Sequence, residues 1–211
     1  MCSDDDKKEA HGNDAKVLLY IRNMRKGLEG DLHIIEALKY IPKSRSPTAT
    51  SIIMPMYDYD LRSWRSHQFQ HNKVVDEDQI WMIAFALGSA FSFLHEGVSV
   101  DDRKRVLNWV PILHLYIKPD NILVRIDFNW KLGKQCVRVV VSDFGMSLLE
   151  NHGYNPNWQG GAYNYQGPEK TQKLTTKATD IYGIGECVYF ACCGEDSVDY
   201  LTERRDEQEN H

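Results

Sequence analysis

The chain has 211 residues, of which 42% are hydrophobic and 26% are charged, and its formal net charge is −5. These proportions are ordinary for a globular protein with a real core. Because the charge balance is acidic and no basic run occurs, composition gives no argument for a nucleic-acid partner or an anionic membrane surface.

Cysteine usage and the chain start indicate a compartment. The five cysteines are an odd number without C-x-x-C spacing, and Cys192 and Cys193 stand together in an apolar run. Reduced, buried thiols are the better interpretation. The N-terminus is acidic and polar, unlike a signal peptide, and no apolar stretch reaches membrane-spanning length. We therefore expect an intracellular protein, cytoplasmic or nuclear, without a membrane partner.

The first third of the chain predicts a tail, a helix and a strand. Residues 1–15 are polar and are expected to form a disordered tail. From Lys16 onwards, apolar residues recur at helical spacing, namely Val17, Ile21, Met24 and Leu28. Residues 51–54 predict a strand that Pro55 stops, because proline cannot donate a ladder hydrogen bond.

Residues 76–97 give the clearest helix. Asp76 or Asp78 can cap its start, and Gly97 can end it. Its apolar stripe consists of Ile80, Ile83, Ala84, Leu87, Phe91 and Leu94. A charged insertion over residues 96–108 follows and is expected to be a surface loop.

The last part predicts two strands and a helix. Residues 122–126 and 137–141 predict paired strands, joined by a polar connection longer than a tight hairpin needs. Residues 180–194 are apolar nearly all round, which predicts a buried helix rather than a surface one, with Gly194 at its end.

The stretch His114-Leu115-Tyr116-Ile117-Lys118-Pro119-Asp120-Asn121 carries the chemistry, together with Asp143-Phe144-Gly145. A lysine can neutralise phosphate charge. Asparagine and aspartate supply the hard oxygens that Mg²⁺ prefers. The combination predicts a site for metal-bound phosphates.

This stretch resembles the catalytic loop of the eukaryotic protein kinases, H-R-D-L-K-P-x-N. Residues 161–169 resemble the family's G-T-x-x-Y-x-A-P-E segment, and residues 180–185 resemble its D-x-W/Y-S-x-G helix start. The resemblance implies an α+β, protein-kinase-like fold, and the K-P-x-N order is of the Ser/Thr type.

The resemblance also implies roles for individual residues. Asn121 and Asp143 would hold Mg²⁺, and Lys118 would approach the transferred phosphate of ATP. Residues 54–61 resemble the hinge, where the backbone of Pro55 and Tyr57 would hold the adenine.

Two further residues are expected to be architectural rather than catalytic. In the family, the aspartate at the position of Asp180 bonds the backbone of the catalytic loop. The same expectation holds for His114.

The chain departs from the family at reactive positions. Tyr116 stands where the pattern has its catalytic aspartate, and Ala162 stands where the family has a threonine that bonds that aspartate. A phenol with a pKa near 10 is a poor proton acceptor at neutral pH. Two losses in one hydrogen-bond network indicate that phosphoryl transfer is not what the site does.

Parts of the family pattern are missing upstream and downstream. No Gly-rich loop or strand lysine precedes the hinge, and the helix glutamate expected near residues 20–22 is absent. ATP and Mg²⁺ are therefore expected to bind weakly or not at all. The resemblance covers residues 16–194: an N-lobe remnant over 16–55 and a truncated, mainly helical C-lobe over 56–194, followed by a polar tail over 195–211.

Three hypotheses follow. The first is a catalytically impaired pseudokinase that acts by binding a protein, for example another kinase. The second is a divergent Ser/Thr protein kinase, for which the retained Lys118, Asn121 and Asp143 speak. The third is an incomplete gene product, because an apolar helix would lack its covering helices.

Overall fold

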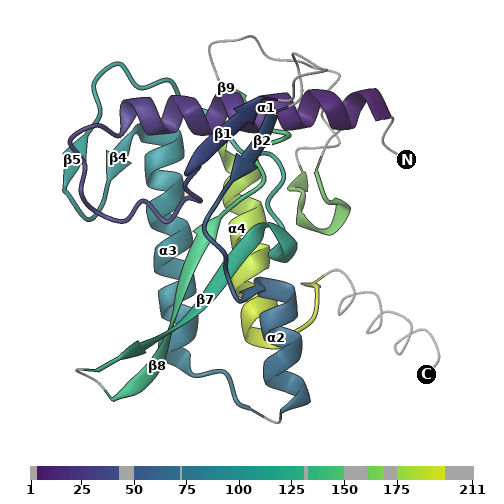
Figure 1. Ribbon diagram of the computed structural model, residues 1–211. Helices are drawn as coiled ribbons and strands as arrows, with labels where there is room; N and C mark the ends of the chain where they lie inside the picture. The colour runs from purple at the N-terminus through teal and green to yellow at the C-terminus, as the bar shows by residue number, and fades with distance from the viewer. Residues whose placement is uncertain are drawn as a thin grey trace.

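The computed structural model describes residues 4–42, 50–71, 73–130, 133–149, 161–168 and 175–197 (Figure 1). The helices are α1 (Asp4–Met24), α2 (Leu61–Gln70), α3 (Glu77–Glu96) and α4 (Lys177–Cys193), with short 3-10 helices η1 (Pro119–Asn121) and η3 (Tyr163–Tyr165). The strands are β1 (Lys39–Pro42), β2 (Thr50–Ile53), β3 (Tyr59–Asp60), β4 (Val98–Ser99), β5 (Lys104–Arg105), β6 (Ile112–Leu113), β7 (Ile122–Asn129), β8 (Lys134–Val141) and β9 (Leu148–Leu149).

The elements form an α+β arrangement, as the sequence predicts. α1 crosses one end of the molecule beside the β1–β2 hairpin, while α3 and α4 run side by side away from it (Figure 1). β3, β7 and β8 form an antiparallel sheet in that order, and β8 packs along α3. The pairs β4–β5 and β6–β9 are also antiparallel.

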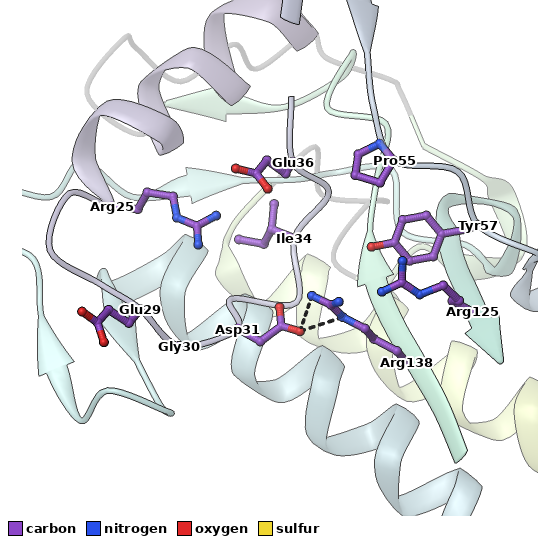
Figure 2. A pocket seen from close by; sticks show the side chains of 10 residues that line it. All are labelled: Arg25, Glu29, Gly30, Asp31, Ile34, Glu36, Pro55, Tyr57, Arg125 and Arg138. Atoms are coloured by element: carbon purple, nitrogen blue, oxygen red, sulfur yellow. Dashed lines mark hydrogen bonds and ion pairs between the residues drawn. The ribbon is translucent and has the colours of Figure 1, made fainter. Parts of the chain in front are cut away.

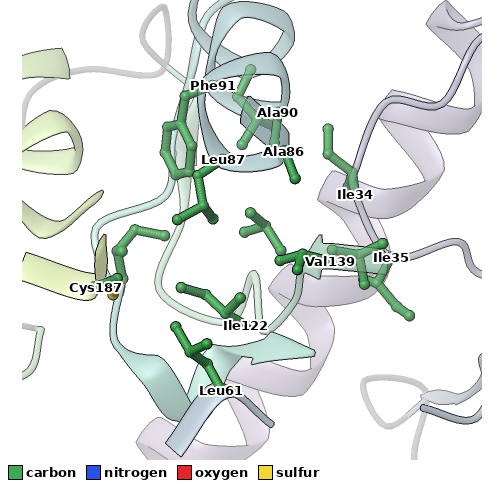
Figure 3. Packing of buried hydrophobic residues seen from close by; sticks show 14 of the residues in the cluster. Ile34, Ile35, Leu61, Ala86, Leu87, Ala90, Phe91, Ile122, Val139 and Cys187 are labelled. Atoms are coloured by element: carbon green, nitrogen blue, oxygen red, sulfur yellow. The ribbon is translucent and has the colours of Figure 1, made fainter. Parts of the chain in front are cut away.

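One hydrophobic core joins the two ends of the molecule. It combines the α1 stripe of Val17, Leu18 and Ile21 with residues of α3, β7, β8 and α4. Figure 3 shows Ile34 and Ile35 of the segment after α1 facing Val139 of β8 and the α3 side chains. Burying one such aliphatic side chain contributes about 1.5–3 kcal/mol. α1 is thus held by the same core as α3, β7, β8 and α4.

Backbone hydrogen bonds fix the segment after α1 to β8. Ile35 N donates to Val141 O at 2.9 Å, and Val141 N donates to His33 O at 2.9 Å. His33 adopts a positive φ of 54° to make this turn. The approach to the hinge is therefore attached to the strand that delivers Asp143.

α3 confirms its predicted limits. The Asp76 side chain accepts a hydrogen bond from Asp78 N, and Gln79 completes a capping box. Gly97 ends the helix with a φ of 66°, in the left-handed region where glycine costs least. A Cβ at this position would lie only 2.6 Å from the Trp109 ring, so space also requires glycine.

α1 begins well before Lys16. The helix starts at Asp4, so residues 4–15, expected to belong to a disordered tail, are helical in the structure. Tertiary contacts explain the difference, because the Asn13 side chain bonds three carbonyl oxygens of the turn after β8. Such contacts can stabilise a helical start that has no apolar period of its own.

The β7–β8 ribbon is longer than predicted. The expected polar connection over residues 127–135 is wrong, because pairing continues from Asp127↔Cys136 to Asn129↔Lys134. The outer part of the ribbon projects past the helices (Figure 1), and polar residues can occupy a strand that does not face the core.

The insertion over residues 96–108 contains the β4–β5 hairpin rather than an irregular loop alone.

α4 is buried along one face, so the predicted buried helix is confirmed for that face and not for the opposite one. Asp180, Gly183, Cys187, Phe190 and Ala191 are buried. Ile181 is 54% exposed and Tyr182 is 37% exposed. Gly194 caps the helix with a φ of 85°, as predicted.

Within the described residues, no helix combines the length and apolar character that crossing a membrane requires.

Candidate functional site

The loop after β6 is held from behind by Asp180 of α4. Asp180 accepts hydrogen bonds from His114 N at 2.8 Å and from Leu115 N at 2.7 Å. His95 of α3 lies 2.8 Å from the same carboxylate through Nε2. Leu115 has a positive φ of 62°, which is costly for a non-glycine residue. The buried carboxylate therefore stabilises a strained loop, and its predicted architectural role is confirmed.

His114 lies fully buried inside this framework. Its Nε2 donates to Ser142 O at 3.0 Å, and its Nδ1 accepts from Tyr116 N at 3.3 Å. Burial lowers the pKa of His114, while Asp180 acts in the opposite direction. The bonds match a neutral imidazole, so His114 connects the loop to the strand before Asp143.

Tyr116 and Lys118 contact each other at the front of the loop. Lys118 Nζ donates to the Tyr116 hydroxyl at 3.2 Å and lies 4.6 Å from the centre of the phenol ring. Both side chains are partly buried. The lysine expected to approach a phosphate is thus bound by the residue that replaces the catalytic aspartate.

Asn121 is brought next to Asp143 by backbone pairing. Asn121 O accepts from both Ser142 N and Ser142 Oγ at 2.9 Å. The Asn121 amide nitrogen donates to Tyr116 O at 2.7 Å, which leaves Oδ1 as its free ligand atom. Asp143 is exposed and has a positive φ of 64°. An amide oxygen and an exposed carboxylate fit the oxygen preference of Mg²⁺.

The described residues contain no cluster of three or more His, Cys, Asp or Glu side chains that could hold a metal without other ligands. A cation at Asn121 and Asp143 would need further oxygens from a phosphate or from water.

Sequence reasoning missed the acidic residue that faces Asp143. This residue is Asp14, whose side chain accepts a hydrogen bond from the Phe144 backbone. Its spacing from Val17 and Ile21 puts Asp14 on the buried face of α1. The spacing is visible in the sequence, but the helix predicted from Lys16 onwards leaves Asp14 out.

Asp14 is an unusual carboxyl group. Burial and the nearby charge of Asp143 raise its pKa to about 7, although the hydrogen bond from Phe144 lowers it. Its Oδ1 atom is shielded and has no partner in the described structure. The neighbouring Asn13 amide donates to the carbonyls of Phe144, Gly145 and Ser147 at 3.1, 3.2 and 2.8 Å. The end of α1 therefore fixes the turn that carries Asp143.

Ala162 follows a glycine that touches the same loop. Gly161 has a φ of 103°, and a Cβ there would lie 3.0 Å from Leu115 O. Position 162, where the family has a threonine hydroxyl and this chain has alanine, therefore follows a residue that contacts the loop from His114 to Asn121. Glu169, which completes the expected P-E pair, lies outside the described residues.

Gly183 permits close packing rather than phosphate binding. A Cβ on it would lie 3.0 Å from Ile117 Cβ, inside α4. The Gly183-x-Gly185 pair therefore lies inside a helix and does not form a phosphate-binding loop after a strand.

Pro55 and Tyr57 lie apart from the Lys118 side chain. Asp58 N donates to Val124 O at 3.1 Å, and β3 pairs with β7, so the hinge is attached to the ribbon. The side chains of Pro55 and Tyr57 line a cavity of ≈ 250 Å³ with charged residues (Figure 2). Lys118, Asn121 and Asp143 are not among its lining residues. The predicted adenine contacts from the backbone of Pro55 and Tyr57 stay a prediction.

Comparison with known proteins gives a consistent picture. The family model described as protein kinase domain matches residues 7–210, beyond both ends of the 16–194 range taken from the motifs. L-type lectin-domain containing receptor kinase I.8 of Arabidopsis thaliana is 36% identical over 116 residues, which cover 54% of this chain and 15% of that protein. The probable receptor kinase II.1 of the same lectin-domain group and organism is 31% identical over 156 residues, covering 70% and 20%. The chain thus spans about a fifth or less of these relatives' length.

Proposed function

The chain belongs to the protein kinase family, and from this premise we propose that it is a catalytically impaired member that acts by binding. One observation carries the proposal. Lys118 is hydrogen-bonded to Tyr116 and stacked on its ring, at the position where the family has its general base. Lys118, the cation for the phosphate, is therefore engaged by another residue, and the acceptor for the substrate proton is replaced by a phenol.

The energetic argument has two parts. Loss of a general base typically costs about 10²–10⁴ in rate. Most of the remaining catalysis in phosphoryl transfer comes from positioned cations, and here Lys118 would have to leave Tyr116 first. Ala162 adds a third loss, because it cannot donate or accept a side-chain hydrogen bond.

Nucleotide binding is proposed to be weak. Asn121 Oδ1 and the Asp143 carboxylate would hold Mg²⁺, which would neutralise charge on the phosphates. Asp14 places a second carboxyl group close to Asp143. When ionised, it would attract a cation and repel the phosphates that come with it.

The partner is proposed to be a protein, in the first instance another kinase. The matched relatives are named receptor kinases, but the chain covers only 15–20% of the first two. Their lectin and receptor functions are therefore not carried over. An intracellular location, cytoplasmic or nuclear, belongs to the same proposal and is supported by the free thiols of Cys136, Cys187, Cys192 and Cys193.

Phosphotransfer by the purified chain tests the proposal. With Mg-ATP, we expect neither autophosphorylation nor phosphorylation of a generic protein substrate above the level of an Asp143→Ala control. The paired change Tyr116→Asp with Ala162→Thr should raise any residual rate, because it releases Lys118 and restores the acceptor. Clear activity in the unmodified chain that disappears in Asp143→Ala would refute the proposal.

A divergent Ser/Thr protein kinase is the second candidate. It is favoured by the retained Lys118, Asn121 and Asp143 and by the backbone pairing that brings Asn121 beside Asp143. A thermal-shift titration separates the candidates, because a ligand at 100 times its Kd stabilises the folded state by about 2.7 kcal/mol. Saturable stabilisation by millimolar Mg-ATP that is lost in Asp143→Ala would favour the kinase, and its absence would favour the binding protein.

A further inference from the structure

A cavity beside Pro55 and Tyr57 is lined by three arginines and three acidic residues. We call it the rear-hinge cavity; it is lined by Arg25, Glu29, Gly30, Asp31, Ile34, Glu36, Pro55, Tyr57, Arg125 and Arg138. Figure 2 shows Arg25, Arg125 and Arg138 entering it from α1's end, β7 and β8 respectively. Three guanidinium groups from separate segments therefore surround one space of ≈ 250 Å³.

Two of these arginines are placed directly opposite each other. Arg125 of β7 and Arg138 of β8 are register partners in the antiparallel ribbon. Like charges at such positions destabilise a strand pair, whereas opposite charges would stabilise it. Asp31 balances Arg138 at 2.8 Å, whereas the nearest carboxylate to Arg125, that of Asp127, is 3.7 Å away. An anion between the two arginine side chains would offset the repulsion that remains.

Arg138 is held in place but keeps donors to spare. Its Nε and Nη2 approach one oxygen of Asp31 at 2.9 and 2.8 Å. A guanidinium has five N–H groups, so the Nη1 edge remains for a second acceptor. Asp31 thus orients Arg138 in the way that a preorganised binding group requires.

Arg125 is less well satisfied. Its guanidinium lies 5.5 Å from the centre of the Tyr57 ring, and its Nε is 3.7 Å from the nearest Asp127 oxygen. That Nε is shielded from solvent and makes no hydrogen bond in the described structure. Stacking on Tyr57 fixes the group, while its terminal nitrogens keep their capacity to donate.

We propose that the rear-hinge cavity binds a phosphate monoester carried on a side chain of a protein partner. A phosphate offers three acceptor oxygens and up to two negative charges, which suits several guanidinium groups better than a carboxylate does. The Tyr57 hydroxyl is a further donor at the same place. The phosphoryl group is recognised and not transferred, so no bond is made or broken.

The acidic residues of the cavity favour a phosphate group that has a positive charge next to it. Asp31 is engaged by Arg138, but Glu29 and Glu36 are exposed and also line the cavity. They would repel a polyanion and would attract a positive charge next to the phosphate. A phosphorylated serine or threonine beside lysine or arginine would complement both the arginines and the acidic residues of the cavity. Free phosphate would complement only the arginines.

Fluorescence anisotropy with a labelled peptide tests this proposal without any nucleotide, so its outcome is independent of the proposed function. The probe carries one phosphoserine flanked by lysines, and its unphosphorylated twin is the first control. We expect the twin to bind at least about tenfold more weakly, and Arg125→Gln and Arg25→Gln each to weaken the phosphopeptide by about tenfold. Inorganic phosphate should compete only at far higher concentration.

The matched control variant is Arg103→Gln, which removes the same charge from an exposed turn between β4 and β5. It should change the affinity by less than about twofold. Arg125→Gln should change the melting temperature little, because it removes the cross-strand repulsion together with the contacts to Tyr57 and Asp127. Equal binding of both peptides, or equal effects of Arg103→Gln and Arg125→Gln, would overturn the proposal. If inorganic phosphate competed as strongly as the unlabelled phosphopeptide, the cavity would bind free phosphate, and the proposal of a phosphorylated protein side chain would be wrong.

Discussion

The back and the front of the loop from His114 to Asn121 differ in how fully their polar groups are paired. At the back, Asp180 accepts from two backbone amides and lies 2.8 Å from His95, all in buried surroundings. At the front, Lys118 contacts Tyr116, and Asp14 keeps a shielded oxygen without a partner in the described structure. The framework of a kinase loop is complete while its reacting positions are altered. The contacts that hold the loop are therefore made by residues other than those at its altered positions.

The largest expected loss of stability comes from a substitution behind the loop, Asp180→Ala. Asp180→Ala would leave two buried N–H groups and His95 without their acceptor, in a loop whose Leu115 has a positive φ. Breaking a buried charged network in this way costs about 3–5 kcal/mol. Urea denaturation followed by circular dichroism measures the loss.

Asp120→Ala is the matched control for this change. Asp120 lies in the same segment, but its ion pair with Arg62, at 3.3 Å, is largely exposed. Such pairs contribute about 0–1 kcal/mol. If the two variants lost similar stability, the buried hydrogen bonds of Asp180 would not stabilise the protein more than the exposed ion pair of Asp120 does.

The second prediction concerns the packing of α4 against the loop. Gly183→Val would place side-chain atoms against Ile117, since even a Cβ lies 3.0 Å from Ile117 Cβ. Gly185→Val brings the same change in helix propensity at a position where a Cβ meets nothing within 4 Å. We expect the free energy of unfolding of Gly183→Val to be lower than that of Gly185→Val by about 1–3 kcal/mol, which urea denaturation measures as a lower midpoint. Equal midpoints would show that the loop can move away from α4 without cost.

The back of the loop was largely predictable because its determinants are local or belong to a family pattern. The α3 limits follow from Asp76 and Gly97, which are capping residues next to a clear apolar stripe. Asp180 was expected to bond the loop backbone from the resemblance, and the two short hydrogen bonds confirm it.

What the sequence could not give depends on register and on tertiary contact. Arg125 and Arg138 are 13 residues apart, and their opposition follows only from the register of the β7–β8 ribbon. The polar and aromatic residues near its tip had suggested a loop. Asp14 was missed because the helical start before Lys16 depends on bonds from Asn13 to a turn far along the chain.

The third prediction concerns the carboxyl group of Asp14, whose Oδ1 has no partner in the described structure. A raised pKa means that folded Asp14 holds its proton more tightly than the unfolded chain does, so stability is lost as pH rises from about 4 to about 7. Asp14→Asn removes this loss. In EDTA, we expect the variant to exceed the parent by roughly 1 kcal/mol at pH 8 and to show little difference at pH 4.5. A stability difference that does not change with pH would mean that the carboxyl group titrates normally.

The smallest expected effect is on the contact between Tyr116 and Lys118. Tyr116→Phe removes the hydroxyl that Lys118 bonds at 3.2 Å but keeps the ring at 4.6 Å, so it should cost less than about 1 kcal/mol of stability. Tyr116→Ala removes both contacts. If Tyr116 restrains Lys118, the rate at which an acylating reagent modifies the Lys118 amine should rise from the parent through Tyr116→Phe to Tyr116→Ala, as read by mass spectrometry. Equal rates in all three would show that Lys118 is already available, and the front of the loop would then lack only its base.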